Sequence, residues 1–422
     1  MKTIHDSRFA IHVPRFILAL LFTLHPSLFT GFAQVKTGAD LLFEKHFHLV
    51  QGKRVGLVTN HTGVLSDGRH LADVFYEHQN VTLVALFGPE HGIRGQAAAG
   101  DEVGHGVDKR TGVPAYSLYG ATYKPTPDML KEIEILLFDI QDVGARFYTY
   151  ISTMSYAMEA AAEQGIPFVV LDRPNPIRGT WVEGFVREDT LRSFVSLHPI
   201  PVAHGMTMGE LATMFNEEGW LKDGIKANLT VVRMEGWKRE MWYDQTGLRW
   251  AAPSPNIKTL STAVVYPGTC LVEGTNLSEG RGTERPFEYI AAPFIDGDVL
   301  ASRLNSLALP GVVFKAIEVV PREIPGVVTN PKHDGVASRG VFVAVTNRDS
   351  YEPVKTAVYL IATARNLYPS HFQWRQRSID LLSGTPRFRQ ALDADWSPEE
   401  ITALWASEAK KFGEIRSQHL LY

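Results

Sequence analysis

Ile133-Glu-Ile-Leu-Leu-Phe-Asp139 is a short apolar run that ends in an aspartate, and it shows the pattern that decides the fold. Similar runs occur at Val55–Thr59, Val81–Phe87 and Pro167–Asp172. Among them lie two helical patterns, at 70–78 and about 148–164. Nearly continuous Val, Leu, Ile and Phe strands that alternate with helices are typical of a parallel sheet covered on both faces. The sequence therefore predicts an α/β fold whose N-terminal domain is a Rossmann-like, doubly wound parallel sheet.

Polar side chains follow each of these runs. They are Asn60 and His61, Glu90 and His91, Asp139, Gln141, Asp142 and Arg146, and Asp172, Arg173 and Asn175. In open parallel sheets, ligands bind beyond the carboxyl ends of the strands, where these side chains would gather. A solvated loop also favours Asp, Asn, Gly and Pro, so one such cluster alone is weak evidence. The clusters together favour a functional site at this edge of the sheet.

The second half of the chain has a different pattern. A boundary is predicted at Ala251–Asn256, and two strands are predicted at 312–320 and 340–346. The C-terminus is helical, and Ser397 and Glu400 form the signature of a capping box at the start of one helix. We therefore expect a domain at 34–256 and a smaller α+β C-terminal domain at 257–422.

Composition restricts the class of protein. The chain has 422 residues, of which 45% are hydrophobic and 21% charged, as is ordinary for a soluble globular protein with two or three domains. A formal net charge of −4 gives no electrostatic reason to expect nucleic acid as a partner. Cys270 is the single cysteine, which excludes an intramolecular disulfide and a zinc site built from cysteines.

The N-terminus has the pattern of a secretory signal peptide. Basic residues precede the apolar run Phe16–Leu24, and the small-residue site Gly31-Phe-Ala33 follows it. The apolar run is about half the ~20 residues that a membrane span needs, and no later stretch is long enough. We therefore predict that residues 1–33 are removed after Ala33 and that the protein is exported, to the periplasm or the medium, without a membrane span.

Carboxylates are the most promising catalytic groups. Glu90 comes directly after an apolar run, so the sheet would shield its carboxyl while a ligand could still reach it. Glycoside hydrolases usually act with a pair of carboxylates that flank the glycosidic bond. Asp139, Asp142 and Glu183 are candidates for the second carboxylate, although Asp139 and Asp142 are equally suited to cap the following helix.

The residues that follow Asp142 have two interpretations. Aromatic rings can stack on sugars and an arginine can bind a carboxylate, so Arg146 and Tyr150 are candidate ligand contacts. Phe147 and Tyr148 are better explained as core residues at the start of an amphipathic helix. Arg146 is costly to bury unpaired, so it is expected either in a salt bridge or facing a ligand.

Three further features of the sequence bear on the presence of a pocket, a metal site or a dinucleotide site. The glycine-rich segment 272–284 either folds over the strand ends and completes a pocket or is a flexible connector. The spacing of His61, His91 and His204 matches no metal-ligand pattern, so no metal site is predicted. No Gly-x-Gly-x-x-Gly motif follows the first strand, so dinucleotide binding is not expected.

Five longer motifs occur in order along the chain. They are Phe87-Gly-Pro-Glu-His-Gly-Ile-Arg-Gly95, Phe138-Asp-Ile-Gln-Asp-Val-Gly-Ala-Arg-Phe-Tyr-Thr-Tyr150, Leu171-Asp-Arg-Pro-Asn-Pro176, Glu273-Gly-Thr-Asn-Leu-Ser-Glu-Gly-Arg-Gly-Thr283 and the C-terminal Glu414-Ile-Arg…Leu-Leu-Tyr422. These motifs resemble the NamZ-type exo-β-N-acetylmuramidases, a glycoside hydrolase family that was long catalogued as a domain of unknown function. The resemblance covers nearly the whole chain after residue 33.

The resemblance implies a Rossmann-like domain, a smaller C-terminal domain, a cleft between them and no cofactor. It implies removal of β-1,4-linked N-acetylmuramic acid from the non-reducing end of peptidoglycan fragments. Its partners would be peptidoglycan-derived muropeptides and disaccharides. Glu90 carries over as a catalytic glutamate, and Glu183, Asp139 or Glu273 is its expected partner.

The expected substrate-binding residues come from the strand ends and the glycine-rich segment. They are Asn60, His61, His91, Asp142, Arg146, Tyr150, Arg173, Asn175, Glu273, Asn276 and Arg281. Among them Arg146 and Arg173 are the candidates for binding the lactyl carboxylate of muramic acid. The sequence predicts no particular oligomeric state.

Two other functions use the same features. A muropeptide-binding protein of the periplasm would have the same cleft without turnover. An esterase or amidase acting on the peptide stem or lactyl region is disfavoured because the chain has no Gly-x-Ser-x-Gly motif and no Ser/His pair at a recognisable spacing.

Overall fold

The computed structural model describes residues 34–95 and 104–422, and the predicted signal peptide at 1–33 lies outside the described residues. The described residues belong to one compact unit. The predicted division at 256/257 stays a prediction. Within 34–95 and 104–422, no helix is long and apolar enough to cross a membrane.

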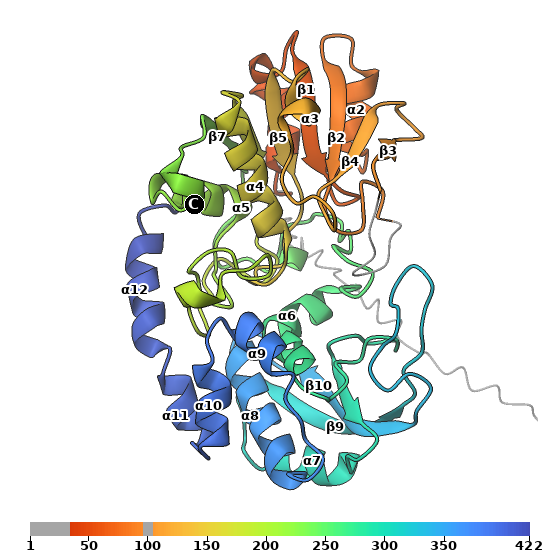
Figure 1. Cartoon of the computed structure of the whole chain (residues 1–422), viewed down its shortest axis with the longest axis vertical. Helices are drawn as coiled ribbons and strands as arrows, with labels where there is room; N and C mark the ends of the chain where they lie inside the picture. The colour runs from red at the N-terminus through yellow and green to blue at the C-terminus, as the bar shows by residue number, and fades with distance from the viewer. Residues whose placement is uncertain (1–33, 96–103) are drawn as a thin grey trace, which may run out of the picture. The chain divides into compact units, whose positions relative to one another are not determined.

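The larger sheet is mostly parallel (Figure 1). Its strands are β1 (Arg54–Thr59), β2 (Thr82–Gly88), β3 (Gly106–Val107), β4 (Pro114–Ser117), β5 (Ile135–Asp139), β6 (Phe168–Leu171) and β7 (Leu229–Val232). The strand order is β3-β4-β2-β1-β5-β6-β7, and only β3 pairs antiparallel to its neighbour. The predicted apolar runs form β1, β2, β5 and β6, which confirms the α/β fold with a parallel sheet. The edge strand β3 and its neighbour β4 were not predicted, because they are short and lack an apolar run.

Helices cover both faces of this sheet. They are α1 (Gly38–Glu44), α2 (Leu71–Glu77), α3 (Pro127–Leu130), α4 (Tyr150–Glu163) and α5 (Met208–Glu217). Alternate residues of β5 enter different cores: Ile135 and Leu137 pack with α1 and α2, whereas Leu136 and Phe138 pack with α4 and α5. Because both faces are buried, the strands need nearly continuous apolar sequence, which is the pattern that predicted them.

The second half contains a smaller antiparallel sheet and most of the remaining helices. The sheet has the order β8-β10-β9, from β8 (Tyr289–Ala292), β9 (Val312–Val319) and β10 (Ser338–Val345). The helices are α6 (Leu260–Thr269), α7 (Gly297–Asn305), α8 (Pro353–Leu367), α9 (Gln376–Ser383), α10 (Arg387–Asp393), α11 (Pro398–Ala403) and α12 (Ala406–Arg416). Short 3₁₀ helices lie at Phe47–Leu49, Asp189–Leu191, Lys222–Gly224, Tyr243–Gln245 and Cys270–Gly274. The predicted capping box of Ser397 and Glu400 begins α11.

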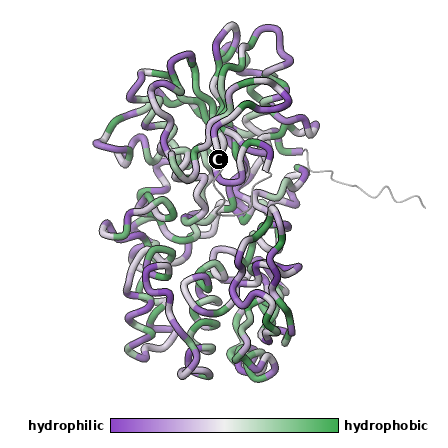
Figure 2. Tube along the Cα trace, turned by 45° about the vertical axis from the view of Figure 1, so that its right-hand side comes forward, coloured by the Kyte–Doolittle hydropathy of each residue, from purple (hydrophilic) through white to green (hydrophobic). Residues whose placement is uncertain are grey.

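Hydrophobic residues run along the central strands, and hydrophilic residues concentrate in the surrounding loops (Figure 2). The end of the chain returns to the larger sheet. The Tyr422 hydroxyl donates to Asp172 Oδ2 at 2.8 Å and accepts from the amide of Met234 at 2.8 Å. The last residue is therefore part of the fold around β6 and β7.

Candidate active site

The polar clusters meet because their strands are neighbours in the sheet. β2, β1, β5 and β6 are adjacent in that order, and they run parallel. Their carboxyl ends therefore share one edge, as the sequence predicted. Around this edge lie the loops that follow β2, β4 and β5 and the segment 250–253.

Glu90 stands on a sharp turn directly after β2. His91, which is buried, has a φ of 73°, and Gly92 has a φ of 72°, so two successive residues have left-handed backbone conformations. Such conformations in a residue other than glycine cluster at functional sites. Glu90 is half-buried, and Thr149 Oγ1 lies 3.4 Å from its Oε2.

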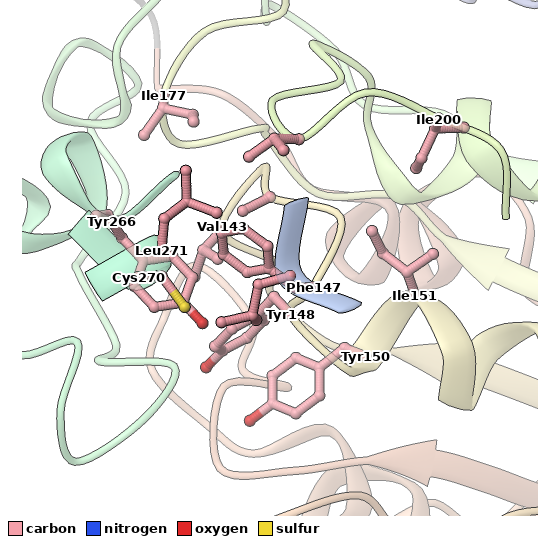
Figure 3. Packing of buried hydrophobic residues seen from close by; sticks show 14 of the residues in the cluster. Val143, Phe147, Tyr148, Tyr150, Ile151, Ile177, Ile200, Tyr266, Cys270 and Leu271 are labelled. Carbon is pink, nitrogen blue, oxygen red and sulfur yellow. The ribbon is translucent and has the colours of Figure 1, made fainter. Parts of the chain in front are cut away.

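The charge of Glu90 raises the pKa of three tyrosines, Tyr119, Tyr148 and Tyr150. Burial first, and then the charge of Glu90, raises the pKa of Tyr119 and of Tyr150. Tyr148 has its pKa raised well above the ordinary value, mainly by burial and with a contribution from Glu90. Figure 3 shows the hydroxyls of Tyr148 and Tyr150 on the same side of the packed rings. Among these three, the Tyr119 hydroxyl hydrogen-bonds with Glu90, whereas Tyr148 and Tyr150 feel its charge.

Several buried polar atoms near these tyrosines have no hydrogen-bond partner among the described residues. They are Asn60 Nδ2, His61 Nδ1, Gln141 Oε1, Asp142 Oδ1, Tyr148 OH and His204 Nε2. Asn60 and Asp142 both influence the pKa of Tyr150, so they lie close to that side chain. A buried polar group left unpaired costs roughly 1–3 kcal/mol, so such a cluster indicates a site for a polar ligand.

Local contacts fix the orientation of the two strongest candidates in this cluster. Asn60 Oδ1 accepts from the amide and the hydroxyl of Thr62, at 2.9 and 2.6 Å, which leaves Asn60 Nδ2 to interact with the Tyr150 hydroxyl, whose pKa it lowers. Asp142 Oδ2 accepts from the amide of Gly144 at 2.7 Å, and His204 Nε2 lies 3.7 Å from the same oxygen. Asp142 Oδ1 remains available to a ligand.

The segment 250–253 is tied to the same site. His61 Nε2 lies 2.7 Å from the carbonyl of Ala252, and the Tyr150 hydroxyl donates to the carbonyl of Pro253 at 2.7 Å. Burial lowers the pKa of His61, which favours its neutral form. The predicted site residues His61 and Tyr150 thus hold the segment 250–253 at the site. His61 Nδ1 has no hydrogen-bond partner among the described residues.

The glycine-rich segment brings Arg281 to the site. Arg281 Nη2 pairs with Glu273 Oε1 at 2.9 Å, and the Arg281 charge lowers the pKa of Tyr119 against the larger effects of burial and Glu90. Lys332 donates to the carbonyls of Val272, Glu273 and Leu277, at 3.1, 3.2 and 2.8 Å. These bonds argue against the interpretation as a flexible connector.

Comparisons with known proteins show the family. A family model described as the N-terminal part of exo-β-N-acetylmuramidase NamZ matches residues 55–261, and one described as the C-terminal part matches residues 264–422. The chain belongs to the NamZ exo-β-N-acetylmuramidase family. This membership confirms the resemblance found in the sequence and the expectation of a glycoside hydrolase.

One relative and two solved structures match this chain over nearly its whole length. The peptidoglycan β-N-acetylmuramidase NamZ of Bacillus subtilis (strain 168) is 50% identical over 390 residues, which are 92% of this chain and 92% of that protein. Crystal structures of two DUF1343 family proteins from Bacteroides fragilis NCTC 9343 are also similar. Their TM-scores are 0.85 and 0.75 and their identities 41% and 33%, and each match covers 92% of this chain and 99% of the other.

Asp139 and Arg173 lie at the site edge but bind each other in this NamZ family member. Arg173 Nε and Nη2 donate to Asp139 Oδ1 and Oδ2, at 2.6 and 2.9 Å, and Nη2 also donates to the carbonyl of Val64 at 2.8 Å. Both side chains are buried. Asn175 is also occupied, since its Nδ2 donates to Met206 O and its Oδ1 accepts from the amide of Ile177. These contacts fix the loops that follow β5 and β6.

Arg146 has partners that the sequence analysis did not foresee. It is buried, and its two Nη atoms donate to the carbonyls of Phe185, Ile200 and Leu382, at 2.6, 2.7 and 2.7 Å. Three backbone carbonyls bind its Nη atoms in place of a salt bridge or a ligand, while its Nε has no partner among the described residues. Burial lowers the pKa of Arg146 to about 9. Its placement ties the loop after β5 to the end of α9 and does not support a role for Arg146 in binding the lactyl carboxylate.

Glu183 caps a helix of the second half. Its two carboxylate oxygens accept from the amides of Val354 and Lys355, at 3.2 and 2.6 Å, in the first turn of α8. Burial raises the pKa of Glu183 to about 7 against the lowering effect of these hydrogen bonds. Asn276 is likewise engaged elsewhere, with the backbone of His371 and Gln373.

The raised pKa of Glu183 predicts a pH dependence of stability. The folded protein holds the proton up to about pH 7, whereas the unfolded chain loses it near the ordinary glutamate pKa of 4.5. The contribution of Glu183 to the free energy of unfolding is therefore fully present below pH 4.5 and is lost as the pH rises to about 7. The melting temperature of Glu183→Gln, relative to that of the wild type, should therefore rise as the pH is raised from 4.5 to about 7. Glu318→Gln, at an exposed position of β9, should show no such trend, and parallel curves for Glu183→Gln and wild type would contradict the assignment.

Sequence reasoning missed two residues that contact Glu90. Tyr119 follows β4, and that short strand begins with Pro114, so no apolar run indicated that a strand end was near. Thr149 is the residue before α4, and nothing in its type marks it as a ligand of a carboxylate. Tyr148 was expected in the core, and its ring is buried there as predicted, but its hydroxyl faces the site. Within the described residues, no group of three or more His, Cys, Asp or Glu side chains could hold a metal ion.

Proposed function

We propose that this chain is an exo-acting glycoside hydrolase that releases β-1,4-linked N-acetylmuramic acid from the non-reducing end of peptidoglycan fragments. The observation that carries the proposal is the group of unpartnered buried polar atoms beside Glu90. Family membership and 50% identity to a peptidoglycan β-N-acetylmuramidase support the substrate class.

Glu90 acts as the general acid in this proposal. It donates a proton to the glycosidic oxygen as the bond to the muramic acid breaks. Thr149 and Tyr119 are positioning residues, because their hydroxyls hold the orientation of the carboxyl. Burial of Tyr148 and Tyr150 keeps the floor of the site dry, which strengthens its electrostatic interactions.

Asp142 is the proposed second carboxylate. Glu90 and Asp142 both raise the pKa of Tyr150, so that hydroxyl lies near both carboxylates. The other candidates have partners: Asp139 binds Arg173, Glu183 caps α8 and Glu273 binds Arg281. Asp142 Oδ1 alone among these four carboxylates is both buried and unpartnered. Asp142 would stabilise positive charge on the sugar ring or activate water.

Asp142→Asn should lower kcat by about a hundredfold or more, because the neutral amide cannot stabilise the developing positive charge. The asparagine oxygen can still accept from the amide of Gly144, so the turn should remain intact. Asp128→Asn, at an exposed position of α3, is the matched control. Initial rates of muramic acid release measure the effect, and a rate within threefold of wild type would remove Asp142 from the mechanism.

Two rival functions make different demands on the structure. A binding protein would use the same polar cluster without turnover. An esterase would need an accessible nucleophile. The structure does contain a Ser/His contact, with Ser155 Oγ 2.5 Å from His198 Nε2, but both residues are buried and the Phe215 ring stacks on His198 at 3.6 Å. This pair is closed to substrate and favours the glycosidase.

The exo-acting function is tested with an alternating glycan of several residues that begins with N-acetylmuramic acid at its non-reducing end. Mass spectrometry should find free N-acetylmuramic acid and a product shorter by one sugar at the first time points. Binding without release would establish the binding protein instead. Early release of internal fragments would show an endo-acting enzyme.

The proposed substrate also indicates where in the cell this protein acts. Peptidoglycan lies outside the cytoplasmic membrane, and the proposed signal peptide at 1–33 would deliver the enzyme there. We therefore propose that the protein is exported and cleaved after Ala33.

A further inference from the structure

Four partly exposed aromatic rings form a strip beside the site, and none of them has a role in the mechanism above except Tyr119. We call Tyr119, Tyr123, Tyr156 and Phe194 the aromatic strip. Tyr119 and Tyr123 come from the loop between β4 and α3, Tyr156 from α4, and Phe194 from the loop after the 3₁₀ helix at Asp189–Leu191.

The rings are close enough to make a continuous surface. The centroids of Tyr123 and Phe194 lie 4.2 Å apart, and Tyr119 lies 6.1 Å from each of them. Tyr156 is stacked with Phe194 at 6.2 Å with an interplanar angle of 3°. These spacings are typical of interacting aromatic pairs. The Ser152 hydroxyl donates to the carbonyl of Phe194 at 2.6 Å, which fixes this loop against α4.

The strip is more exposed than the floor of the site. Tyr148 and Tyr150, on the floor of the site, are 8% and 1% exposed, whereas Tyr119 is half-buried and Tyr123 is 39% exposed. A gathered set of partly exposed aromatic rings beside a ligand site is typical of a binding surface.

Tyr119 joins the strip to the reacting centre. Its hydroxyl interacts with Glu90, while its ring faces Tyr123 and Phe194. A general acid must stand within hydrogen-bond reach of the glycosidic oxygen, so the leaving sugar begins next to Glu90. The muramyl ring takes the buried polar cluster, and the leaving sugar must lie toward solvent because an exo-acting enzyme leaves the rest of the chain outside. The strip begins at that point and runs in the more exposed direction.

From this placement we infer that the aromatic strip binds the N-acetylglucosamine ring on the leaving side of the scissile bond, by stacking of the sugar on Tyr123 and Phe194. The inference rests on the proposed function. Sugar rings present an apolar face of C–H groups that suits an aromatic surface, and the hydroxyls at their edges stay in water.

Charge at the edge of the strip favours a neutral sugar over a peptide stem. Lys124, next to Tyr123, is paired with Glu159 at 3.2 Å and with Glu163 at 2.7 Å. The two carboxylates more than offset the charge of this lysine, so this edge does not attract the carboxylates of a peptide. The surface beside the strip offers neutral aromatic faces, which fit an N-acetylglucosamine ring better than a carboxylate-bearing peptide.

The test compares two ligands in a background that binds but does not turn over. In Glu90→Gln, isothermal titration gives the affinities for N-acetylmuramic acid and for the disaccharide N-acetylmuramyl-β-1,4-N-acetylglucosamine. Adding Tyr123→Ala and Phe194→Leu should weaken disaccharide binding about tenfold and leave monosaccharide binding unchanged. Tyr76→Ala is the control. Tyr76 is a 55% exposed residue of α2, which precedes the start of β2, whereas Glu90 follows the opposite end of that strand.

The outcomes separate this inference from the proposed function. Phe194→Leu keeps apolar bulk, and Tyr123→Ala alone, at an exposed position, should still give part of the loss if the double variant unfolds. An unchanged ratio of the two affinities would overturn the inference while wild-type release of muramic acid upholds the enzyme. Equal weakening of both ligands would place the muramyl ring on the strip and would also overturn it. If the wild type releases no muramic acid, the proposed function itself fails.

Discussion

Glu90→Gln should lower kcat for the disaccharide N-acetylmuramyl-β-1,4-N-acetylglucosamine by about 10²–10⁴-fold, the usual contribution of a general acid–base group. Glutamine fills the same space and can still accept from Thr149, but it has no proton to give to the glycosidic oxygen. The affinity for the disaccharide should change little, since the buried polar cluster is untouched. The loss should therefore lie in kcat rather than in KM.

Steady-state rates of muramic acid release measure this effect, with Glu240→Gln as an exposed control. A substrate with a good leaving group, such as an aryl glycoside, should recover part of the rate of Glu90→Gln, because such a leaving group needs less protonation. A wild-type rate in Glu90→Gln would move the acid–base role to another carboxylate.

Arg146→Met should lower the free energy of unfolding by about 3 kcal/mol or more. The substitution keeps an apolar stem of similar length but leaves the carbonyls of Phe185, Ile200 and Leu382 without their donor. Each buried acceptor left unpaired costs roughly 1–3 kcal/mol, and partial relaxation reduces the sum. Arg146 joins residues 236 positions apart, so the loss also weakens the contact between the loop after β5 and α9.

Urea unfolding followed by fluorescence gives this free energy, provided that the slope with urea is the same in both proteins. Arg377→Met, at an exposed position of α9, should stay within about 0.5 kcal/mol of wild type. A loss below about 1 kcal/mol for Arg146→Met would show that the three carbonyls find other partners.

The sequence predicted the sheet because a parallel sheet buried on both faces leaves a strong signal. β1, β2, β5 and β6 each need apolar residues at successive positions, and their carboxyl ends necessarily share one edge. The gathering of polar side chains at that edge follows from the topology and not from side-chain packing. This is why the place of the site could be predicted.

Pairing among the charged residues could not be predicted in the same way. A charged residue next to a strand end needs a partner, but its type does not say which one. Asp139 pairs with Arg173, Glu183 caps a helix that begins some 170 residues later, and Arg146 uses carbonyls. Each depends on how distant segments pack. Tyr119 was missed for a related reason, since the short strand before it has no recognisable pattern.

A comparison of two isomeric disaccharides tests the central claim most directly. The protein is incubated with N-acetylmuramyl-β-1,4-N-acetylglucosamine and, separately, with N-acetylglucosaminyl-β-1,4-N-acetylmuramic acid, and the products are identified by mass spectrometry. We expect the first disaccharide to be split into its two sugars and the second to stay intact. Absence of cleavage of the first disaccharide, or equal cleavage of the second, would contradict the central claim.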